Sequence, residues 1–511
     1  MREPDREEAL SDRLVRLRAK SGVFFVGSLG AVNLVVGFAG SIVLARMLVP
    51  ADFGVVAIGT TLIMVSTSLA DGGLASGLIR REKRASPGEL RAALALQLAL
   101  TSALAGIAAT VGIVVGGSGL VVALMMAGLP VSALQTPGRI LLSRELRFRV
   151  LATVEAGGML GYYVWAVAGV SAGLGVWALA SAVLVRAVIS ACGVMAASRL
   201  GLLGPSFREI GALRPVIAFG LRFQAVSFAG MGREQGLNAG IAAISGVSTL
   251  GFWTLTRRLL ELPVLMFEPL HRVSFPYLSR MRAAGRDPSQ LLDRGVAVAG
   301  TASGFVLVAG AAAAPELVPA IFGEQWRPVV PIFQWVCMAL LVAGPLAVMA
   351  VGFLYSVDAP SAVLRATVAH ALVLFAVAFP LLPVLGPEAI GIGSFAGAVT
   401  DAWLMSRAVS SRCAASPLKA LWPTLAVAAP ATAVGLAVTA AAPAGLIGAA
   451  AGGLAAAGCY VALLAVARRS TLAETARLIA DAVRSAVTRE SSLASTQELG
   501  QRDTVAAATS S

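Results

Sequence analysis

Three ionisable residues lie close together in a segment whose other residues are typical of a membrane-spanning helix. The segment "WTLTRRLLELPVL" runs from Trp253 to Leu265 and carries Arg257, Arg258 and Glu261. On a helix Glu261 can pair with Arg257 at i, i+4 or with Arg258 at i, i+3, but one carboxylate cannot neutralise two guanidinium groups. A guanidinium presents a planar fork of donors that matches phosphate oxygens. The spacing therefore predicts a site for an anionic, phosphate-bearing cargo.

Other charges extend this site. An ionisable residue at mid-membrane costs about 2.5–3.5 kcal/mol on insertion scales and usually faces a cavity or a partner. Arg222 and Arg233 are eleven positions apart, which places them within about 20° of each other on one helical face. We predict substrate binding by Arg46, Arg222, Arg233, Arg257 and Arg258, and coupling or charge pairing by Glu261, Glu234 and Asp71. Two alternatives stay open: Arg46 and Arg222 snorkel to headgroups, and Asp71 caps a broken helix.

The elements that must position these residues are apolar helices. The chain has 511 residues, is 57% hydrophobic and only 13% charged, and has a mean hydropathy of +0.83, whereas a soluble chain carries about 25% charged residues. A spanning helix needs about 20 mostly apolar residues. The sequence accordingly predicts an all-α integral membrane fold of about fourteen spanning helices, near 22–45, 54–78, 92–114, 120–138, 150–170, 175–197, 215–244, 249–270, 295–314, 329–356, 362–380, 388–410, 420–440 and 445–467.

The basic residues predict the orientation of these helices. Of the 40 Lys and Arg residues, 32 fall in the termini and in alternate loops, and only Arg46 and Arg327 fall in the opposite loops. Because Lys and Arg gather in short cytoplasmic loops, both termini are expected in the cytoplasm. The net charge of +13 is then explained by topology, and no nucleic acid is expected as a partner.

A weak internal repeat predicts two halves. "MLVPADFGVVAIGTTL" (47–62) and "SGVSTLGFWTLTRRL" (245–259) each join two apolar segments by a short turn, and Gly54 aligns with Gly251 at an offset of 197. We expect parallel repeats of six helices, with the last two helices added. The predicted organisation is a cytoplasmic amphipathic N-terminus, an N-lobe, a C-lobe, two extra helices and a partly disordered cytoplasmic tail, at 1–20, 21–199, 200–410, 411–467 and 468–511.

Catalysis and cofactors are not predicted. No loop is long enough for a soluble catalytic domain, the four Cys and two His residues are scattered, and no Walker motif is present. We therefore expect no enzyme activity, no catalytic residue, no metal site and no cofactor.

Five segments in order carry a family resemblance: "LARMLVPADFGVVAIG" (44–59), "SLADGGLASGLIRR" (68–81), "LLSRELRFRVLATVEAGG" (141–158), "GLGVWALASA" (173–182) and "IFGEQWRPVVPIFQ" (321–334). They resemble the polysaccharide flippases of the multidrug/oligosaccharidyl-lipid/polysaccharide exporter superfamily. The resemblance implies two six-helix lobes forming a V, and alternating access in the bacterial inner membrane. Its implied cargo is an undecaprenyl-pyrophosphate-linked oligosaccharide for O-antigen or exopolysaccharide synthesis, bound by the central arginines.

Several alternatives stay open. A cation-coupled multidrug exporter of the same superfamily needs acidic residues inside one lobe, for which Asp71 is the best candidate. A membrane polysaccharide polymerase needs acidic catalytic groups on a sizeable loop. A lipid II flippase is a variant of the flippase hypothesis, since it would bind a pyrophosphate-linked cargo in the same way. Proton or Na⁺ coupling, and contact with polysaccharide polymerase and export components, are also left open; membrane lipids are partners in every case.

Overall fold

The computed structural model describes residues 27, 29–81, 85–200, 203–267, 274, 276–281 and 284–478. The side chains of 218, 219 and 221–229 fall outside this description, although their backbone is helical. The predicted N-terminal segment 1–20 is not described, and the tail is described only to Leu478. Every regular element in the described ranges is helical, which confirms the all-α prediction.

The first part of the chain forms short and long helices joined by tight turns. After the helix Leu29–Met47 come α2 (Pro50–Asp71), α3 (Leu74–Arg80), α4 (Pro87–Val115), α5 (Ser118–Met126), α6 (Gly128–Ala133), α7 (Thr136–Arg144), α8 (Phe148–Ser171) and α9 (Val176–Ser198). The segment α5–α7 is bent by 49° near residues 134–135. It occupies the place of the predicted span 120–138, so this span is broken.

The segment α10 (Ile210–Leu265) consists of two helices joined at a kink, and it occupies the predicted spans 215–244 and 249–270. Its 56 residues would extend about 84 Å, nearly three times the hydrocarbon thickness. The continuity is interrupted at Gly246, whose φ of 80° and ψ of 176° are not helical. Glycine tolerates this conformation because it has no Cβ. The kink therefore divides α10 into two arms, each long enough to be one span.

The remainder of the chain is also helical: α12 (Ser289–Phe322), the short 3-10 turn η1 (Glu324–Trp326), α13 (Val329–Ser356), α14 (Pro360–Leu385), α15 (Glu388–Ser410), α16 (Pro417–Ala441) and α17 (Leu446–Ala467). Among the described residues eleven helices, or twelve with the bent segment, are long and apolar enough to cross a membrane. Separating the two arms of α10 and adding the more polar 23-residue α15 gives the fourteen predicted spans. The chain is a multi-pass membrane protein.

The described chain divides into two compact units. The first contains the described residues up to Leu259 together with Val318–Ile332 and Leu374–Gly393. The second contains Leu260–Leu317, Phe333–Val373 and the described residues from Ser394. Helices α10, α12, α13, α14 and α15 thus contribute to both units. The lobe boundaries at 199 and 410, and the V, stay predictions.

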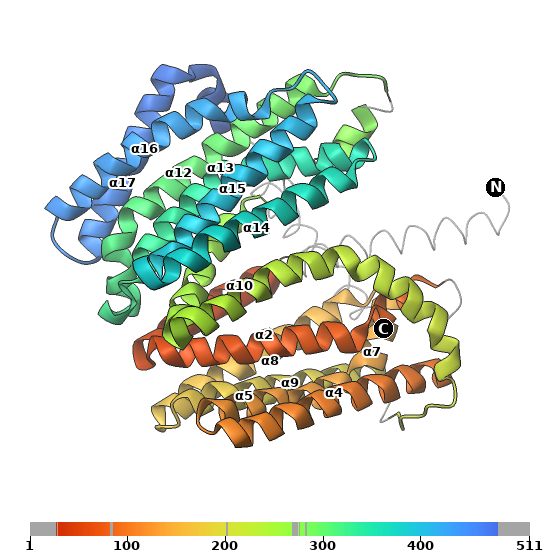
Figure 1. The fold of residues 1–511 in the computed structure, drawn as a ribbon. Coiled ribbons are helices and arrows are strands. Elements are labelled where there is room, and N and C mark those ends of the chain that lie inside the picture. Colours follow the sequence, from red (N-terminus) through yellow and green to blue (C-terminus); the bar gives the residue numbers. More distant parts are fainter. Residues whose placement is uncertain are drawn as a thin grey trace, which may run out of the picture. The chain divides into compact units, whose positions relative to one another are not determined.

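Each unit is held together by close approach of small residues. In the first unit α8 packs along α9, and α2 and α4 pack on α5 (Figure 1). In the second, α16 and α17 form the adjacent blue pair in Figure 1, where a Cβ on Gly452 would lie 1.7 Å from Thr439 Oγ1. Thr439 donates to the Ala312 carbonyl of α12 at 2.9 Å, and the Tyr460 hydroxyl of α17 donates to the Thr301 carbonyl at 3.2 Å. The two extra C-terminal helices are therefore anchored to α12.

Two helix ends in the first unit satisfy each other's carbonyl groups. Arg46 donates from Nε to the Ile321 carbonyl at 2.7 Å and from Nη2 to the Ala320 carbonyl, at the end of α12. In return, Gln325 and Trp326 of η1 donate to the Ala45 carbonyl, each at 2.9 Å, at the end of the first helix. The last carbonyls of a helix have no intrahelical donor. This exchange, the end clamp, accounts for Gln325 and Trp326 in the turn.

The end clamp predicts that replacing Trp326 strongly lowers stability. The Trp326 side chain is fully buried and packs edge-on against Phe53, with 5.0 Å between the ring centroids. Trp326→Ala is expected to lower the free energy of unfolding by about 3–5 kcal/mol, and Trp326→Phe by about 1 kcal/mol through loss of the indole hydrogen bond. Thermal unfolding in detergent measures both. The control is Trp422→Ala, because Trp422 is 66% exposed. Equal melting temperatures for the two alanine variants would contradict the clamp.

Candidate functional site

The predicted arginines and acids of α10 lie on its two arms. Arg233 and Glu234 are on the first arm, and Arg257 and Arg258 are on the second. The kink brings part of this set together, since Arg257 Nη2 lies 3.2 Å from Glu234 Oε2. Both side chains are partly exposed: 43% of the Arg257 side chain and 39% of the Glu234 side chain are accessible. Glu261 follows one turn after Arg257 on the same helix.

Arg258 points to a different group of residues. Its Nη2 donates to the Tyr163 hydroxyl of α8 at 3.3 Å. The same hydroxyl lies 3.4 Å from Ser41 Oγ of the first helix. Ser41 Oγ also donates to the Gly37 carbonyl at 2.7 Å. A chain of polar groups therefore connects the first helix, α8 and the second arm of α10 inside the first unit.

Two glycines of the first helix make room for this chain. A Cβ on Gly37 would lie 2.0 Å from Arg258 Nη2, and a Cβ on Gly40 would lie 2.1 Å from the Tyr163 ring. Gly30, which falls on the same helical face in a stripe of small residues, has no such neighbour within 4 Å among the described residues. The stripe thus serves close packing at Gly37 and Gly40. That packing directs Tyr163 and Arg258 toward each other.

Another polar group joins the first arm of α10 to α2. Asn238 Nδ2 donates to Thr61 Oγ1 at 3.1 Å and to Gln235 Oε1 at 3.2 Å. Asn238 Oδ1 is buried and accepts no hydrogen bond from the described residues. On the face of Arg233, Gly236 and Gly240 are covered by a stacked pair from α14, Phe375 and Phe379.

The remaining predicted residues have individual surroundings. Asp71 accepts from the Gly73 and Ala75 backbone N–H groups at 3.1 and 3.2 Å, and from Gln97 Nε2 at 3.3 Å. It therefore caps the start of α3, as the capping alternative predicted. Arg46 takes part in the end clamp, so its guanidinium donates to the protein's own carbonyl groups at Ala320 and Ile321. The side chain of Arg222 lies outside the described residues.

Sequence reasoning missed Tyr163, Ser41 and Asn238. The signal for Tyr163 was the pair Tyr162–Tyr163 in the middle of an apolar segment, in a chain with five Tyr residues. Asn238 was a polar residue within a predicted span, which is a known mark of a functional or packing role. The partners of these residues come from helices distant in sequence, and only the fold identifies them.

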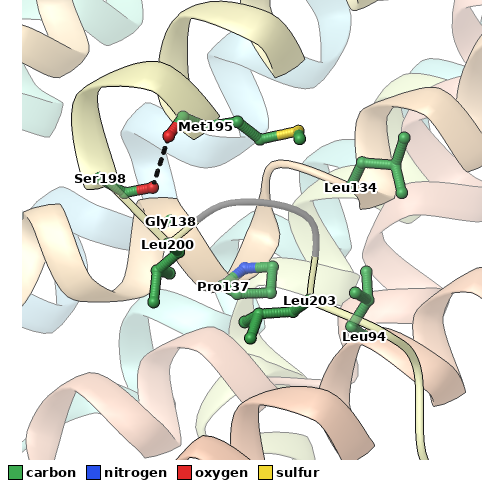
Figure 2. A pocket seen from close by; sticks show the side chains of 8 residues that line it. All are labelled: Leu94, Leu134, Pro137, Gly138, Met195, Ser198, Leu200 and Leu203. Atoms are coloured by element: carbon green, nitrogen blue, oxygen red, sulfur yellow. Dashed lines mark hydrogen bonds between the residues drawn. The ribbon is translucent and has the colours of Figure 1, made fainter.

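One further cavity in the first unit is too small to hold a cargo. It has a volume of about 10 Å³, roughly the space of one water molecule. Figure 2 shows the side chains that line this cavity. The one hydrogen bond drawn among them is donated by Ser198 Oγ to the Met195 carbonyl at 3.1 Å. The other lining residues are Leu94, Leu134, Pro137, Gly138, Leu200 and Leu203. This cavity is a packing defect between α4, α7 and α9.

Comparisons with known proteins agree with the helical architecture. A family model described as "Polysaccharide biosynthesis protein" matches residues 43–331. The lipopolysaccharide biosynthesis protein WzxC of Escherichia coli (strain K12) is 24% identical over 313 residues, which are 59% of this chain and 62% of that protein. The chain thus spans less than two thirds of that relative's length.

Two solved structures share the fold. A structure of the lipid II flippase MurJ in an inward closed conformation matches 87% of this chain and 99% of its own, with a TM-score of 0.65 and 10% identity. An inward-facing multidrug resistance MATE family transporter matches 76% of this chain and 95% of its own, with a TM-score of 0.57 and 14% identity. At these identities the likeness concerns the fold alone.

Proposed function

Because this chain belongs to the polysaccharide biosynthesis protein family, we propose that it is a flippase. Its cargo is a lipid-pyrophosphate-linked oligosaccharide, of the undecaprenyl type in a bacterial cytoplasmic membrane. The cargo crosses by alternating access and is not chemically changed. Both termini face the cytoplasm in this proposal. The fold it shares with a lipid II flippase and with a MATE transporter supports transport as the general activity.

One observation carries the choice of an anionic cargo. Arg257 lies eleven residues beyond the kink at Gly246, or about 16 Å along the second arm, and 43% of its side chain is exposed. An arginine that faced lipid at this depth would be strongly disfavoured. A water-filled cavity that receives a pyrophosphate accounts for its exposure. Arg233 and Arg258 add positive charge, whereas the two acids of this region, Glu234 and Glu261, balance only two of the three arginines.

The surroundings of Asp71 argue against the multidrug alternative. A cation-coupled exporter needs an acidic group that is available to a proton, to Na⁺ or to a cationic drug. Asp71 is engaged in capping α3 and in accepting from Gln97. If ions drive transport, Glu234 beside Arg257 is the better candidate, since cargo binding to Arg257 would change the charge next to Glu234.

Reconstitution in proteoliposomes tests the proposed function. We expect protein-dependent equilibration of a labelled polyprenyl-pyrophosphate disaccharide between leaflets, measured as accessibility to an impermeant reagent. The matched lipid with a single phosphate is expected to move more slowly, because it offers fewer acceptors to the arginines. Lipid II and a cationic dye are run in parallel. Transport of the dye without the glycolipid would favour the multidrug exporter and would reject this proposal.

A further inference from the structure

A second, larger cavity lies in the second compact unit. Its lining residues are distant in sequence from the arginines of α10. Its volume is about 390 Å³, which is within the usual range for a small-molecule site. The start of α12 lines it with Gln290, Asp293 and Arg294, the start of α16 with Lys419, and the chain after α17 with Arg468 and Thr471. All three contributing segments lie at the predicted cytoplasmic ends of their helices.

The charged groups of this cavity leave a positive surplus. Asp293 is occupied by the chain itself, since both of its carboxylate oxygens accept from the Ser416 backbone N–H, at 2.9 and 3.1 Å. Arg294 forms an ion pair with Glu474. The Lys419 side chain makes no hydrogen bond or ion pair with any residue in the described part of the chain. Arg468 lies close enough to Asp293 for the two opposite charges to interact. Three basic side chains, Arg294, Lys419 and Arg468, face two acids, Asp293 and Glu474, so one positive charge is left over, and among the described residues Lys419 and Arg468 form no ion pair within 4 Å.

Apolar surface continues from the cavity along the same helices. Trp422, one turn beyond Lys419 on α16, is 66% exposed, and Val466, just before Arg468, is 89% exposed. Tryptophan is enriched at the level of lipid headgroups. An acyl chain can lie along this surface while its headgroup enters the cavity. A free phosphate ion has no acyl chain and so would not contact Trp422 or Val466.

We propose that this cavity binds the phosphate group of an anionic phospholipid, with Lys419 and Arg468 as its charged contacts. Basic pockets between spanning helices on the cytoplasmic side are suited to anionic headgroups. The lipid would join the starts of α12 and α16 to the end of α17, and so would fix the two extra C-terminal helices. This inference does not depend on the cargo proposed above, because it uses different residues.

The test uses the full-length protein in a zwitterionic detergent. Phosphatidylglycerol, phosphatidylcholine and inorganic phosphate are titrated separately, and binding is followed by native mass spectrometry and by the melting temperature. We expect phosphatidylglycerol to bind and to raise the melting temperature. The double variant Lys419→Gln/Arg468→Gln should bind it at least about tenfold more weakly, and Lys419→Arg should bind it normally.

A matched control removes two charges outside the cavity. Arg412→Gln/Arg477→Gln lies on the same predicted membrane side, and both side chains are exposed. We expect its affinity for phosphatidylglycerol to stay within about twofold of the unmodified protein, since neither residue lines the cavity and exposed charges are screened by salt. Equal losses in both double variants would overturn the proposal, as would a normal affinity in Lys419→Gln/Arg468→Gln. Binding of inorganic phosphate with no preference for phosphatidylglycerol over phosphatidylcholine would identify a soluble anion instead of a lipid.

Discussion

Replacing Arg257 and Arg258 together by Gln is expected to reduce transport of the pyrophosphate-linked glycolipid at least about 100-fold. Each charge-assisted hydrogen bond to a phosphate contributes about 1.5–3 kcal/mol, or roughly tenfold to more than 100-fold in binding. Glutamine keeps most of the side-chain length and some donors, so the change isolates the charge. The measurement is the initial rate in proteoliposomes at sub-saturating glycolipid. A rate near that of the unmodified protein, at equal reconstitution, would exclude a role for these arginines in cargo binding.

The single variants should differ, because the two arginines have different neighbours. Arg257→Gln leaves Glu234 without the partner that lies 3.2 Å away, so a repelling carboxylate faces the cargo. Adding Glu234→Gln should then recover part of the rate, as in a double-mutant cycle. Arg258→Gln breaks the contact with Tyr163. Tyr163→Phe should reproduce only a fraction of that loss, since it frees the guanidinium without removing its charge.

Arg365→Gln is the control for a general loss of positive charge. Arg365 lies near the start of α14 and donates to the Ser361 carbonyl of its own helix at 3.3 Å. It has the same charge as Arg257 but lies at a predicted cytoplasmic end. We expect the transport rate to change less than about twofold. A large loss in this variant would mean that net charge, and not the position of Arg257 and Arg258, limits transport.

Hydropathy and charge predicted the fold well because each spanning helix must satisfy its own backbone and face lipid. This constraint is local, so fourteen segments could be recognised one at a time. The break within α5–α7 was not predicted, because it depends on how the backbone turns at one or two residues, and a window of about 20 residues averages such positions. The kink at Gly246, in contrast, falls between the predicted spans 215–244 and 249–270.

The site was predicted less completely because side-chain partners are set by contacts between distant segments. Arg46 was predicted to bind substrate, with snorkelling to a headgroup as the alternative, but the fold places it at the end of α12, 274 residues away in sequence. Asp71 illustrates the opposite case. Its role as a helix cap depends on the N–H groups of Gly73 and Ala75 just after it, and local sequence was enough to raise that possibility.

The internal repeat gains support from a reciprocal contact in the first unit. A Cβ on Gly54 of α2 would lie 1.8 Å from the Val247 carbonyl oxygen, and a Cβ on Gly251 of α10 would lie 1.9 Å from the Pro50 carbonyl oxygen. The offset of 197 that aligns the two glycines also aligns Pro50 with Val247. The same contact therefore occurs twice, once in each direction. Two helix starts cross here with their backbones touching.

Substituting either glycine should force this crossing apart. The obstructing atoms belong to the backbone, so a rotamer change cannot relieve the clash, and Gly54→Ala or Gly251→Ala must separate the helices by more than about 1 Å. An overpacking cost of about 1–3 kcal/mol on the closed crossing changes the ratio of open to closed forms by about 5- to 150-fold. If transport requires this crossing to close in each cycle, both variants should be strongly impaired.

Labelling of a buried neighbour measures the opening directly. Val55 is 8% exposed and packs in the cluster that contains Val121 and Val247. In a background without the four native Cys residues, Val55→Cys should react slowly with an impermeant thiol reagent, and much faster when Gly54→Ala or Gly251→Ala is added. Gly106→Ala is the control, because a Cβ there meets nothing within 4 Å among the described residues. The two substitutions should also be less than additive when combined, since the first already opens the gap that the second needs. Fully additive effects would mean that the two contacts are independent, and the crossing would then not move as one unit.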